Sequence, residues 1–322
     1  MPHILLLRGI HPDAIARIEA EPGYSWEEVN PDDRPALERA LRQADAVIVR
    51  ATRIDEAFLA LAPRLSIVAR HGVGYDAVDV EALTRRGIPL TVTAYANALS
   101  VAEHTLMLML ALAKGVQRFD AHTRALKWLA DAPVIWDLAG QTVLVVGFGR
   151  IGGRVARLCD AFGMRVLVHD PYVPRNTILG AGFTPVTREA GLAEADWVSL
   201  HCPATPETRG MVDRRFLAAM KPGARLINTA RGSLVDEAAL AEALRSGHLS
   251  GAGLDVFAVE PMRPDNPLRE APNTIFTPHS AAATEQGMRR MGLSCVESII
   301  GHFSGRLDPE MVVNKDVLRR NA

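Results

Sequence analysis

Short, continuous runs of apolar residues alternate with helix-length segments along the first third of the chain. The apolar runs at residues 4–8, Ala46–Val49, 65–69 and Leu90–Val92 predict strands, and residues 12–20 predict a helix. Because these runs are continuous rather than alternating, the strands are expected to be covered on both faces, as in a parallel sheet. Strands separated by helix-length segments predict βαβ units.

A long apolar segment follows at residues 100–119 and predicts a helix. Ser100 is expected to cap this helix, because Glu103 stands at the spacing of a capping box. The segment is apolar on nearly all sides, so the helix should be buried on more than one side. Two alternatives supply the second cover: another copy of the chain, or a second domain.

A second set of apolar runs begins at residue 142 and predicts another parallel α/β region, followed by a helix at residues 284–303. Both sets of runs together predict an α/β fold built on parallel sheets. The strands predicted in the second set are Thr142–Val146, Arg165–His169, Trp197–Leu200, Arg225–Asn228, residues 253–256 and Thr274–Phe276.

Composition and charge exclude several classes of protein. The 322 residues are 48% hydrophobic and carry a formal net charge of -1, and the basic residues do not cluster as they do in a nucleic-acid-binding protein. Cys159, Cys202 and Cys295 are far apart, so we expect reduced thiols in a cytoplasm rather than disulfides or a metal site. Neither the apolar N-terminus nor residues 105–113 are long enough for a signal segment or a membrane span. We expect a cytoplasmic protein without a metal, nucleic-acid or membrane partner.

The run from residue 142 to residue 152 joins a predicted strand, the pattern G-x-G-x-x-G and the start of a helix. Gly147 permits the tight turn, Gly149 lets the backbone approach a pyrophosphate, and Gly152 lets helix and strand pack closely. The N–H groups and the dipole at the start of the helix favour phosphate. A turn of this kind between a strand and a helix predicts a dinucleotide site.

An acidic residue stands where a dinucleotide site needs one. Asp170 closes the next predicted strand, 18 residues after Gly152. A carboxylate there binds the ribose 2′-hydroxyl and repels a 2′-phosphate, which favours NAD over NADP. Arg175 lies close downstream and leaves NADP use open.

Three polar residues follow predicted strands of the second set and match the needs of hydride transfer to a 2-keto acid. Arg231 can hold a carboxylate through two parallel hydrogen bonds. His279 can exchange a proton with the substrate oxygen, and a neighbouring Glu260 would favour the imidazolium and fix the ring. Taken singly, these are an ion-pair residue, a turn residue and a solvated loop acid, but ligands of open α/β sheets bind where such strands end.

Other histidines compete for the role of general acid. His201 also follows a predicted strand, and we interpret it as a cofactor-side or structural residue. His71 and His104 lie in the first strand set and in the long helix, and the sequence places no acidic partner beside either.

The substrate side is expected in the first strand set. Residues 68–76 form a strand and a glycine-containing turn, whose N–H groups can make an anion-binding nest for a carboxylate or simply a strand-to-helix turn. Arg50 and Arg70 end neighbouring strands. Two cations there suit an acidic, even phosphorylated, substrate, or form structural ion pairs.

Together these segments resemble the D-isomer-specific 2-hydroxy-acid dehydrogenases over nearly the whole chain. The segments that carry the resemblance are residues 70–76, 97–103, 147–152, 201–211, 228–236, 253–261 and 277–281. It implies two Rossmann-like, doubly wound parallel-sheet domains with the active site in the cleft between them. The flavodoxin-like substrate domain is expected at residues 1–99 and 285–322, and the NAD-binding domain at residues 100–284. It also implies that the helix near Ser100 belongs to a homodimer interface.

The resemblance also implies roles for individual residues. Arg231, Glu260 and His279 take the family's catalytic positions. Val73 and Gly74 would bind the substrate carboxylate through their N–H groups. The further substrate-side positions are Arg50, Arg70 and Asn97, and the cofactor positions are Gly147, Gly149, Arg150, Ile151, Gly152, Asp170, His201, Thr208, Ala230, Asp255 and Ala281.

Within the family, the segments around Arg50 and Arg70 are most similar to phosphoglycerate dehydrogenases. Within residues 278–282, Ser and Ala stand where many members have Ile or Leu and Gly, which alters the expected shape of the pocket. Hydroxypyruvate, glyoxylate and 3-phosphohydroxypyruvate are therefore retained as alternative substrates. A formate dehydrogenase is disfavoured because that branch pairs Gln with His where this chain has Glu260. The rival function is an NAD-sensing corepressor-like protein that binds a partner without turnover.

Overall fold

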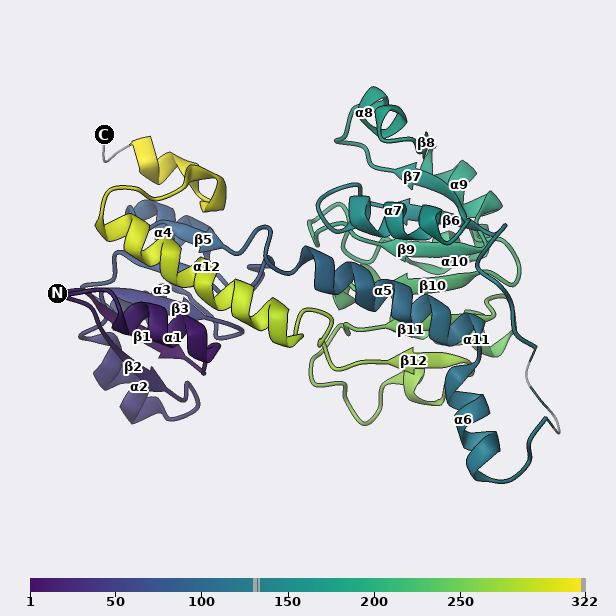
Figure 1. The fold of residues 1–322 in the computed structure, drawn as a ribbon, viewed down its shortest axis with the longest axis horizontal. Helices are drawn as coiled ribbons and strands as arrows, with labels where there is room; N and C mark the ends of the chain where they lie inside the picture. Colours follow the sequence, from purple (N-terminus) through teal and green to yellow (C-terminus); the bar gives the residue numbers. More distant parts are fainter. Residues whose placement is uncertain (130–131, 133, 320–322) are drawn as a thin grey trace. The chain divides into compact units, whose positions relative to one another are not determined.

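The structure is a computed structural model that describes residues 1–129, 132 and 134–319, and it divides into two compact units (Figure 1). Unit 1 comprises residues 1–97 and 283–322, and unit 2 comprises residues 98–282. Each unit has its own parallel sheet with helices packed against it. This confirms the predicted α/β class with two parallel sheets.

The sheet of unit 1 has five parallel strands in the order β2-β1-β3-β4-β5, the flavodoxin-like order. In Figure 1 the long helix α12 runs beside α1 across this sheet, and it also packs against β4. The strands are β1 (His3–Leu7), β2 (Ser25–Val29), β3 (Ala46–Val49), β4 (Ile67–Arg70) and β5 (Leu90–Val92). The helices are α1 (Pro12–Glu19), α2 (Arg34–Leu41), α3 (Glu56–Ala60), α4 (Val80–Arg85), α12 (Glu285–Phe303) and the 3-10 turns η3 (Pro309–Met311) and η4 (Lys315–Arg319).

Strand periodicity divides the core of unit 1 into two layers. Leu5 and Leu7 of β1 pack into a buried cluster with α2, α3 and α4. Ile4 and Leu6, which point to the opposite face, pack with α1 and α12. Both faces of β1 are therefore covered, which explains its uninterrupted apolar sequence.

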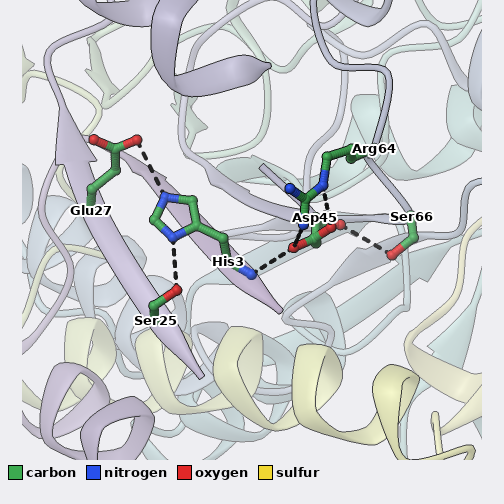
Figure 2. A network of polar contacts seen from close by, with 6 residues as sticks. All are labelled: His3, Ser25, Glu27, Asp45, Arg64 and Ser66. Carbon is green, nitrogen blue, oxygen red and sulfur yellow. Dashed lines mark hydrogen bonds and ion pairs between the residues drawn. The ribbon is translucent and has the colours of Figure 1, made fainter. Parts of the chain in front are cut away.

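A polar network fixes the amino ends of the strands in unit 1 (Figure 2). The His3 N–H donates to Asp45 Oδ2 over 2.8 Å, and Arg64 donates to both carboxylate oxygens of Asp45. The His3 ring lies 2.9 Å from Ser25 Oγ and 3.3 Å from Glu27 Oε1, both on β2. One carboxylate and one imidazole thus hold the start of β1 against its neighbours.

The sheet of unit 2 has seven parallel strands in the order β12-β11-β10-β9-β6-β7-β8, a Rossmann order with one added strand. The strand order reverses between β6 and β9, where such sheets bind ligands. The strands are β6 (Thr142–Val146), β7 (Arg165–His169), β8 (Thr184–Pro185), β9 (Trp197–Leu200), β10 (Arg225–Asn228), β11 (Gly251–Leu254) and β12 (Thr274–Phe276). The helices are α5 (Ala98–Ala113), α6 (Val116–Arg124), α7 (Gly152–Ala161), α8 (Arg175–Gly180), α9 (Arg188–Glu194), α10 (Arg214–Ala219), α11 (Glu237–Arg245) and the 3-10 turns η1 (Gly232–Leu234) and η2 (Pro267–Glu270).

Two glycines of β11 let α5 lie close to the sheet of unit 2. A Cβ added at Gly253 would lie 3.0 Å from Leu108 Cβ, and one added at Gly251 would lie 3.4 Å from Leu112 Cδ2. Figure 1 shows α5 crossing the strands of this sheet, and the helix packs on β10, β11 and β12. A larger side chain at either glycine would push the helix outward.

The long helix differs from its prediction at both ends. It begins at Ala98, so Ser100 is a buried residue inside α5 rather than its cap. The helix stops at Ala113, and Gly115, with a left-handed φ of 59°, starts the separate helix α6. The apolar pattern alone did not indicate that one helix ends before Gly115 and another begins after it.

Three short elements were not predicted from the sequence. The strand β2 carries two glutamates and a serine on the edge of its sheet, so its pattern is too polar to indicate a buried strand. Helix α2 and the two-residue edge strand β8 were also missed. Each of these elements lies at an edge or on the surface, where burial imposes the weakest pattern.

None of the helices that the structure describes is long and apolar enough by itself to cross a membrane. The bent pair α5 and α6 meets the length and composition criterion only when its two helices are taken together.

Candidate functional site

Three adjacent strands of unit 2 end in the residues predicted to carry out hydride transfer. Arg231 follows β10, Glu260 follows β11, and His279 follows β12. These strands pair in the order β12-β11-β10, so their carboxyl ends meet at one edge of the sheet. The sheet topology therefore gathers residues that are far apart in the sequence.

Glu260 and His279 form an ion pair with a distance of 2.7 Å between Oε2 and Nδ1. The other carboxylate oxygen of Glu260 accepts the Phe257 N–H over 3.0 Å. Burial alone would raise the pKa of Glu260, but the hydrogen bonds from His279 and Phe257, with the charges of His279 and Arg231, lower it overall. Glu260 is therefore an ionised acceptor, so His279 must carry a hydrogen on Nδ1 and its Nε2 is left to exchange a proton.

Arg231 is held by the turn that follows β10. The Asn228 side chain donates to the Arg231 carbonyl over 2.9 Å and accepts the Ala230 N–H over 3.0 Å, which folds this turn. The Arg231 guanidinium donates to the Ala230 carbonyl and is close enough to Glu260 to lower the pKa of its carboxyl. A half-buried guanidinium beside this pair can bind a carboxylate.

The loop that carries His279 wraps around the buried carboxylate of Asp255. Asp255 is 1% exposed, and its carboxylate accepts the N–H groups of Ser280, over 2.8 Å, and Ala281, over 3.0 Å. Its carbonyl accepts the His279 N–H over 2.7 Å. His279 has a φ of +52°, in the left-handed region that side chains other than glycine seldom adopt. The loop holds that conformation through four contacts with one residue, counting the Thr277 hydroxyl at 2.6 Å.

The glycine turn between β6 and α7 fits a dinucleotide. A Cβ added at Gly147 would lie 2.8 Å from the His201 carbonyl carbon, and one added at Gly152 would lie 1.9 Å from the Gly147 oxygen. Both glycines are required by the fold itself. An added Cβ at Gly149 would meet nothing within 4 Å, so the protein's own packing does not require glycine there. Glycine at this position leaves the backbone open to close approach by a ligand such as a pyrophosphate.

Asp170 stands at the end of β7 beside this turn. Its Oδ2 accepts the Phe148 N–H over 2.7 Å, and its Oδ1 accepts the N–H groups of Tyr172 and Val173. The carboxylate thus ties the glycine turn to the loop after β7. It also borders a cavity of about 640 Å³ that Arg175 and twelve other residues line.

His201 cannot serve as the proton donor. Its Nε2 lies 2.8 Å from Ser199 Oγ, and its Nδ1 is buried without a partner among the residues that the structure describes. Burial lowers the pKa of His201 to about 3, so the ring is neutral at pH 7. Its backbone packs against Gly147, which supports the interpretation of a structural or cofactor-side residue.

The other predicted cofactor residues of unit 2 lie in its loops. Arg150 is exposed and Ile151 is half-buried at the start of α7. Thr208 uses its hydroxyl within its own loop, because Oγ1 donates to the Pro203 carbonyl over 2.6 Å and accepts the Thr205 N–H over 2.8 Å.

The predicted substrate residues lie in unit 1. Arg50 follows β3 and Arg70 ends β4, and these strands are paired, with Val49 opposite Arg70. Arg50 makes no ion pair or hydrogen bond with the residues described for this chain. The Arg70 guanidinium lies over Gly72 and donates to the His71 carbonyl; a Cβ at Gly72 would lie 1.6 Å from Arg70 Nη1. Gly72 therefore makes room for this cation.

The turn after β4 also leaves hydrogen-bonding groups unused. The N–H groups of Val73 and Gly74 donate to no acceptor within the described parts of the chain. Asn97, the last residue of the first segment of unit 1, is 8% exposed, and its Oδ1 has no partner among the residues described. The two N–H groups remain available to an anion, as a nest would require, whereas Asn97 Oδ1 can only accept a hydrogen bond.

Two contributors to the site were not found by sequence reasoning. Asn228 folds the Arg231 turn, and Thr277 lies between His104 and Asp255, with 2.9 Å to His104 Nε2 and 2.6 Å to Asp255 Oδ1. No acidic partner of His104 was predicted, whereas Asp255 Oδ1 lies 3.6 Å from His104 Nε2. Their separation along the chain hid these contacts, since only the packing of α5 on β11 creates them.

Residues 106–281 match the family described as "D-isomer specific 2-hydroxyacid dehydrogenase, NAD binding domain". The chain is 42% identical over 313 residues to D-3-phosphoglycerate dehydrogenase of Mycobacterium leprae, covering 97% of this chain and 59% of that protein. It is 36% identical over 324 residues to glyoxylate reductase of Korarchaeum cryptofilum, covering 99% of this chain and 97% of that protein. The chain thus spans about half to three fifths of the length of the curated phosphoglycerate dehydrogenases that it matches.

A solved structure agrees with the fold. The crystal structure of D-lactate dehydrogenase from Aquifex aeolicus, complexed with NAD and lactic acid, is similar with a TM-score of 0.87 and 31% identity. The similarity covers 97% of this chain and 99% of that one.

Proposed function

Because the chain belongs to the D-isomer-specific 2-hydroxyacid dehydrogenase family, we propose that it transfers a hydride between NAD and a small 2-keto or 2-hydroxy acid. The observation that carries the proposal is the Glu260–His279 pair, with 2.7 Å between its atoms, beside the guanidinium of Arg231. A carboxylate-oriented imidazole next to a cation is the set of groups that reduction of a 2-keto acid needs.

The three side chains divide the chemistry. Arg231 binds the substrate carboxylate and stabilises the negative charge that develops on the carbonyl oxygen. His279, held through Nδ1 by ionised Glu260, donates a proton from Nε2 to that oxygen in reduction and accepts it in oxidation. Glu260 stabilises the charged ring and keeps Nε2 aimed at the substrate.

The cofactor is NAD, held by the glycine turn of unit 2. Gly147, Gly149 and Gly152 provide the close backbone approach, and Asp170 takes the ribose 2′-hydroxyl. Bound NAD supplies or accepts the hydride. The buried residues Asp255 and Ala281, with Ala230, would line the nicotinamide end, and Thr208, Arg150, Ile151 and His201 the phosphate side.

The substrate side is expected in unit 1. Val73 and Gly74 would bind the substrate carboxylate through their free N–H groups. Asn97, also in unit 1, is the further substrate-side residue. Arg50 and Arg70 at paired strand ends favour an acid with a second anionic group. This ranks 3-phosphohydroxypyruvate first, with hydroxypyruvate and glyoxylate as the alternatives.

We propose that the protein is a homodimer in a reducing compartment, the cytoplasm. Helix α6 buries none of its residues, and large apolar side chains nearby are exposed, including Leu126 at 91% and Trp128 at 74%. Exposed apolar surface of this kind commonly marks an interface. The three cysteines are unpaired, as a reducing compartment would leave them.

The direct test follows NADH oxidation with hydroxypyruvate, glyoxylate, pyruvate and 3-phosphohydroxypyruvate. Turnover of at least one acid is expected. His279→Ala should lower kcat by roughly 100-fold or more while NADH affinity is retained, and Arg231→Ala should weaken both substrate binding and rate. NADH binding without turnover of any acid would contradict the proposal and favour the NAD-sensing binding protein instead.

A further inference from the structure

A stripe of residues on α5 leads to the loop that carries His279. His104, Leu108 and Leu112 are four residues apart and share one face of the helix. Leu112 packs over Gly251 and Leu108 over Gly253, at 3.4 Å and 3.0 Å from the positions of added Cβ atoms. One helical turn rises about as far as two strand residues. The stripe therefore continues to His104 at the level of Asp255, the residue directly after β11.

The hydrogen bonds at the end of this stripe have a defined direction. The Asp255 carboxylate only accepts, so the Thr277 hydroxyl donates to its Oδ1 over 2.6 Å. The Thr277 oxygen then accepts from His104 Nε2 over 2.9 Å. Burial lowers the pKa of His104, although the charge of Asp255 raises it, so at pH 7 the ring is neutral with its hydrogen on Nε2.

The chain of hydrogen bonds ends on the backbone of His279. The same Asp255 accepts from Ser280 N and Ala281 N through its carboxylate and from His279 N through its carbonyl. These bonds surround the residue whose φ of +52° is otherwise unfavourable. If Asp255 rotates, that conformation loses its support.

We propose that His104 and Thr277 are positioning residues, which orient Asp255 and thereby hold the His279 loop in the conformation that sets its imidazole against Glu260. The proposal rests on the proposed function of His279 as the proton donor. It assigns to α5 a part in the chemistry of unit 2 besides its packing. Neither residue has to touch substrate or cofactor.

The test compares Thr277→Val, which removes the hydroxyl at nearly constant volume, with Thr277→Ser, which keeps it. Thr277→Val should lower kcat about tenfold, the cost of one hydrogen bond to a charged group, with KM and the Kd for NADH within about twofold. Thr277→Ser should restore most of the rate. His104→Phe, which keeps the bulk on α5, should reproduce the loss, and it serves as the second variant should Thr277→Val fold poorly.

His248→Gln is the matched control, because His248 also bonds through Nε2, to the Leu217 carbonyl, away from this loop. Its kcat should stay within about twofold of the native value. If the kcat values of Thr277→Val and His104→Phe also stay within about twofold of the native value, the proposal is overturned.

The NMR signals of the His279 imidazole nitrogens, assigned by their loss in His279→Gln, report the environment of this ring whether or not the protein turns over a substrate. They therefore test the positioning role independently of the proposed function. They should move in Thr277→Val and return in Thr277→Ser. If the native protein reduces no 2-keto acid, the proposed function fails while these signals still decide the positioning role. Unmoved His279 signals in both Thr277→Val and His104→Phe would refute it.

Discussion

His71 makes the stability of unit 1 depend on pH in a calculable way. The residue is 3% exposed, its N–H donates to the Val49 carbonyl over 2.8 Å, and its Nε2 has no partner among the residues described. Burial lowers the pKa of His71 to about 4, and the charges of Arg50 and Arg70 act in the same direction. The ring is therefore buried in its neutral form.

The sign and size of the effect follow from linkage. Above pH 6.5 the ring is neutral in both the folded and unfolded chain, and His71 contributes no pH dependence. Between pH 6.5 and about pH 4 the unfolded chain binds a proton that the folded chain does not, so stability falls as the pH falls. Because the unfolded ring is already half protonated at pH 6.5, acidification from pH 6.5 to pH 5 should destabilise unit 1 by about 1.6 kcal/mol.

Amide hydrogen exchange read by mass spectrometry measures this for each unit separately. Peptides from β1, β3 and β4, corrected for the intrinsic rate of exchange, should lose about 15-fold in protection between pH 6.5 and pH 5. In His71→Gln this loss should largely disappear. Equal pH dependence in the variant and the native protein would refute the reasoning, since the proton would then be taken up elsewhere.

Three further predictions concern the glycines and the acid of the binding segments. Gly152→Ala should destabilise unit 2 by about 3 kcal/mol or more, because its Cβ would lie 1.9 Å from a backbone oxygen. Gly149→Ala should leave thermal stability nearly unchanged but weaken NADH binding about tenfold or more, as measured by fluorescence titration. Gly72→Ala, at a φ of +142° and 1.6 Å from Arg70 Nη1, should displace that guanidinium and raise KM for a phosphorylated acid more than for glyoxylate. Asp170→Ala should narrow the preference for NAD over NADP in kcat/KM.

Each of these has an outcome that counts against it. Equal loss of stability in Gly149→Ala and Gly152→Ala would show that packing, not a ligand, requires both glycines. A uniform change of KM for all acids in Gly72→Ala would remove Arg70 from substrate selection. An unchanged cofactor ratio in Asp170→Ala would remove that carboxylate from the ribose.

The sequence predicted the buried strands well because burial on both faces leaves an uninterrupted apolar run. Ala46–Val49, Thr142–Val146 and Arg225–Asn228 were found with their observed bounds. The strand β2 was not predicted because a strand at the edge of a sheet tolerates polar residues such as its two glutamates. The break at Gly115 was not predicted because apolar residues continue on both sides of it.

The site was predictable where a residue follows a strand, and hidden where it acts across the fold. Glu260 and His279 were expected to pair, and their atoms lie 2.7 Å apart. The contact of His104 with Thr277 joins residues 173 positions apart, and it depends on two glycines that admit α5 to β11. No local pattern encodes such a contact, because its cause is the distance between a helix and a sheet.

The path of the chain through its two units bears on how such a protein can be rebuilt. The backbone passes from one unit to the other only twice, after residue 97 and after residue 282. Arg231, Glu260 and His279 all belong to the inserted segment, whereas Arg50 and Arg70 belong to the two-part unit around it. A chimaera that exchanges residues 98–282 between relatives therefore needs two junctions. It would transplant the three residues proposed to carry the chemistry as a set, while the recipient keeps the two arginines proposed to select the acid. Exchange of this one segment between relatives could therefore change the residues proposed for hydride transfer independently of those proposed for substrate selection.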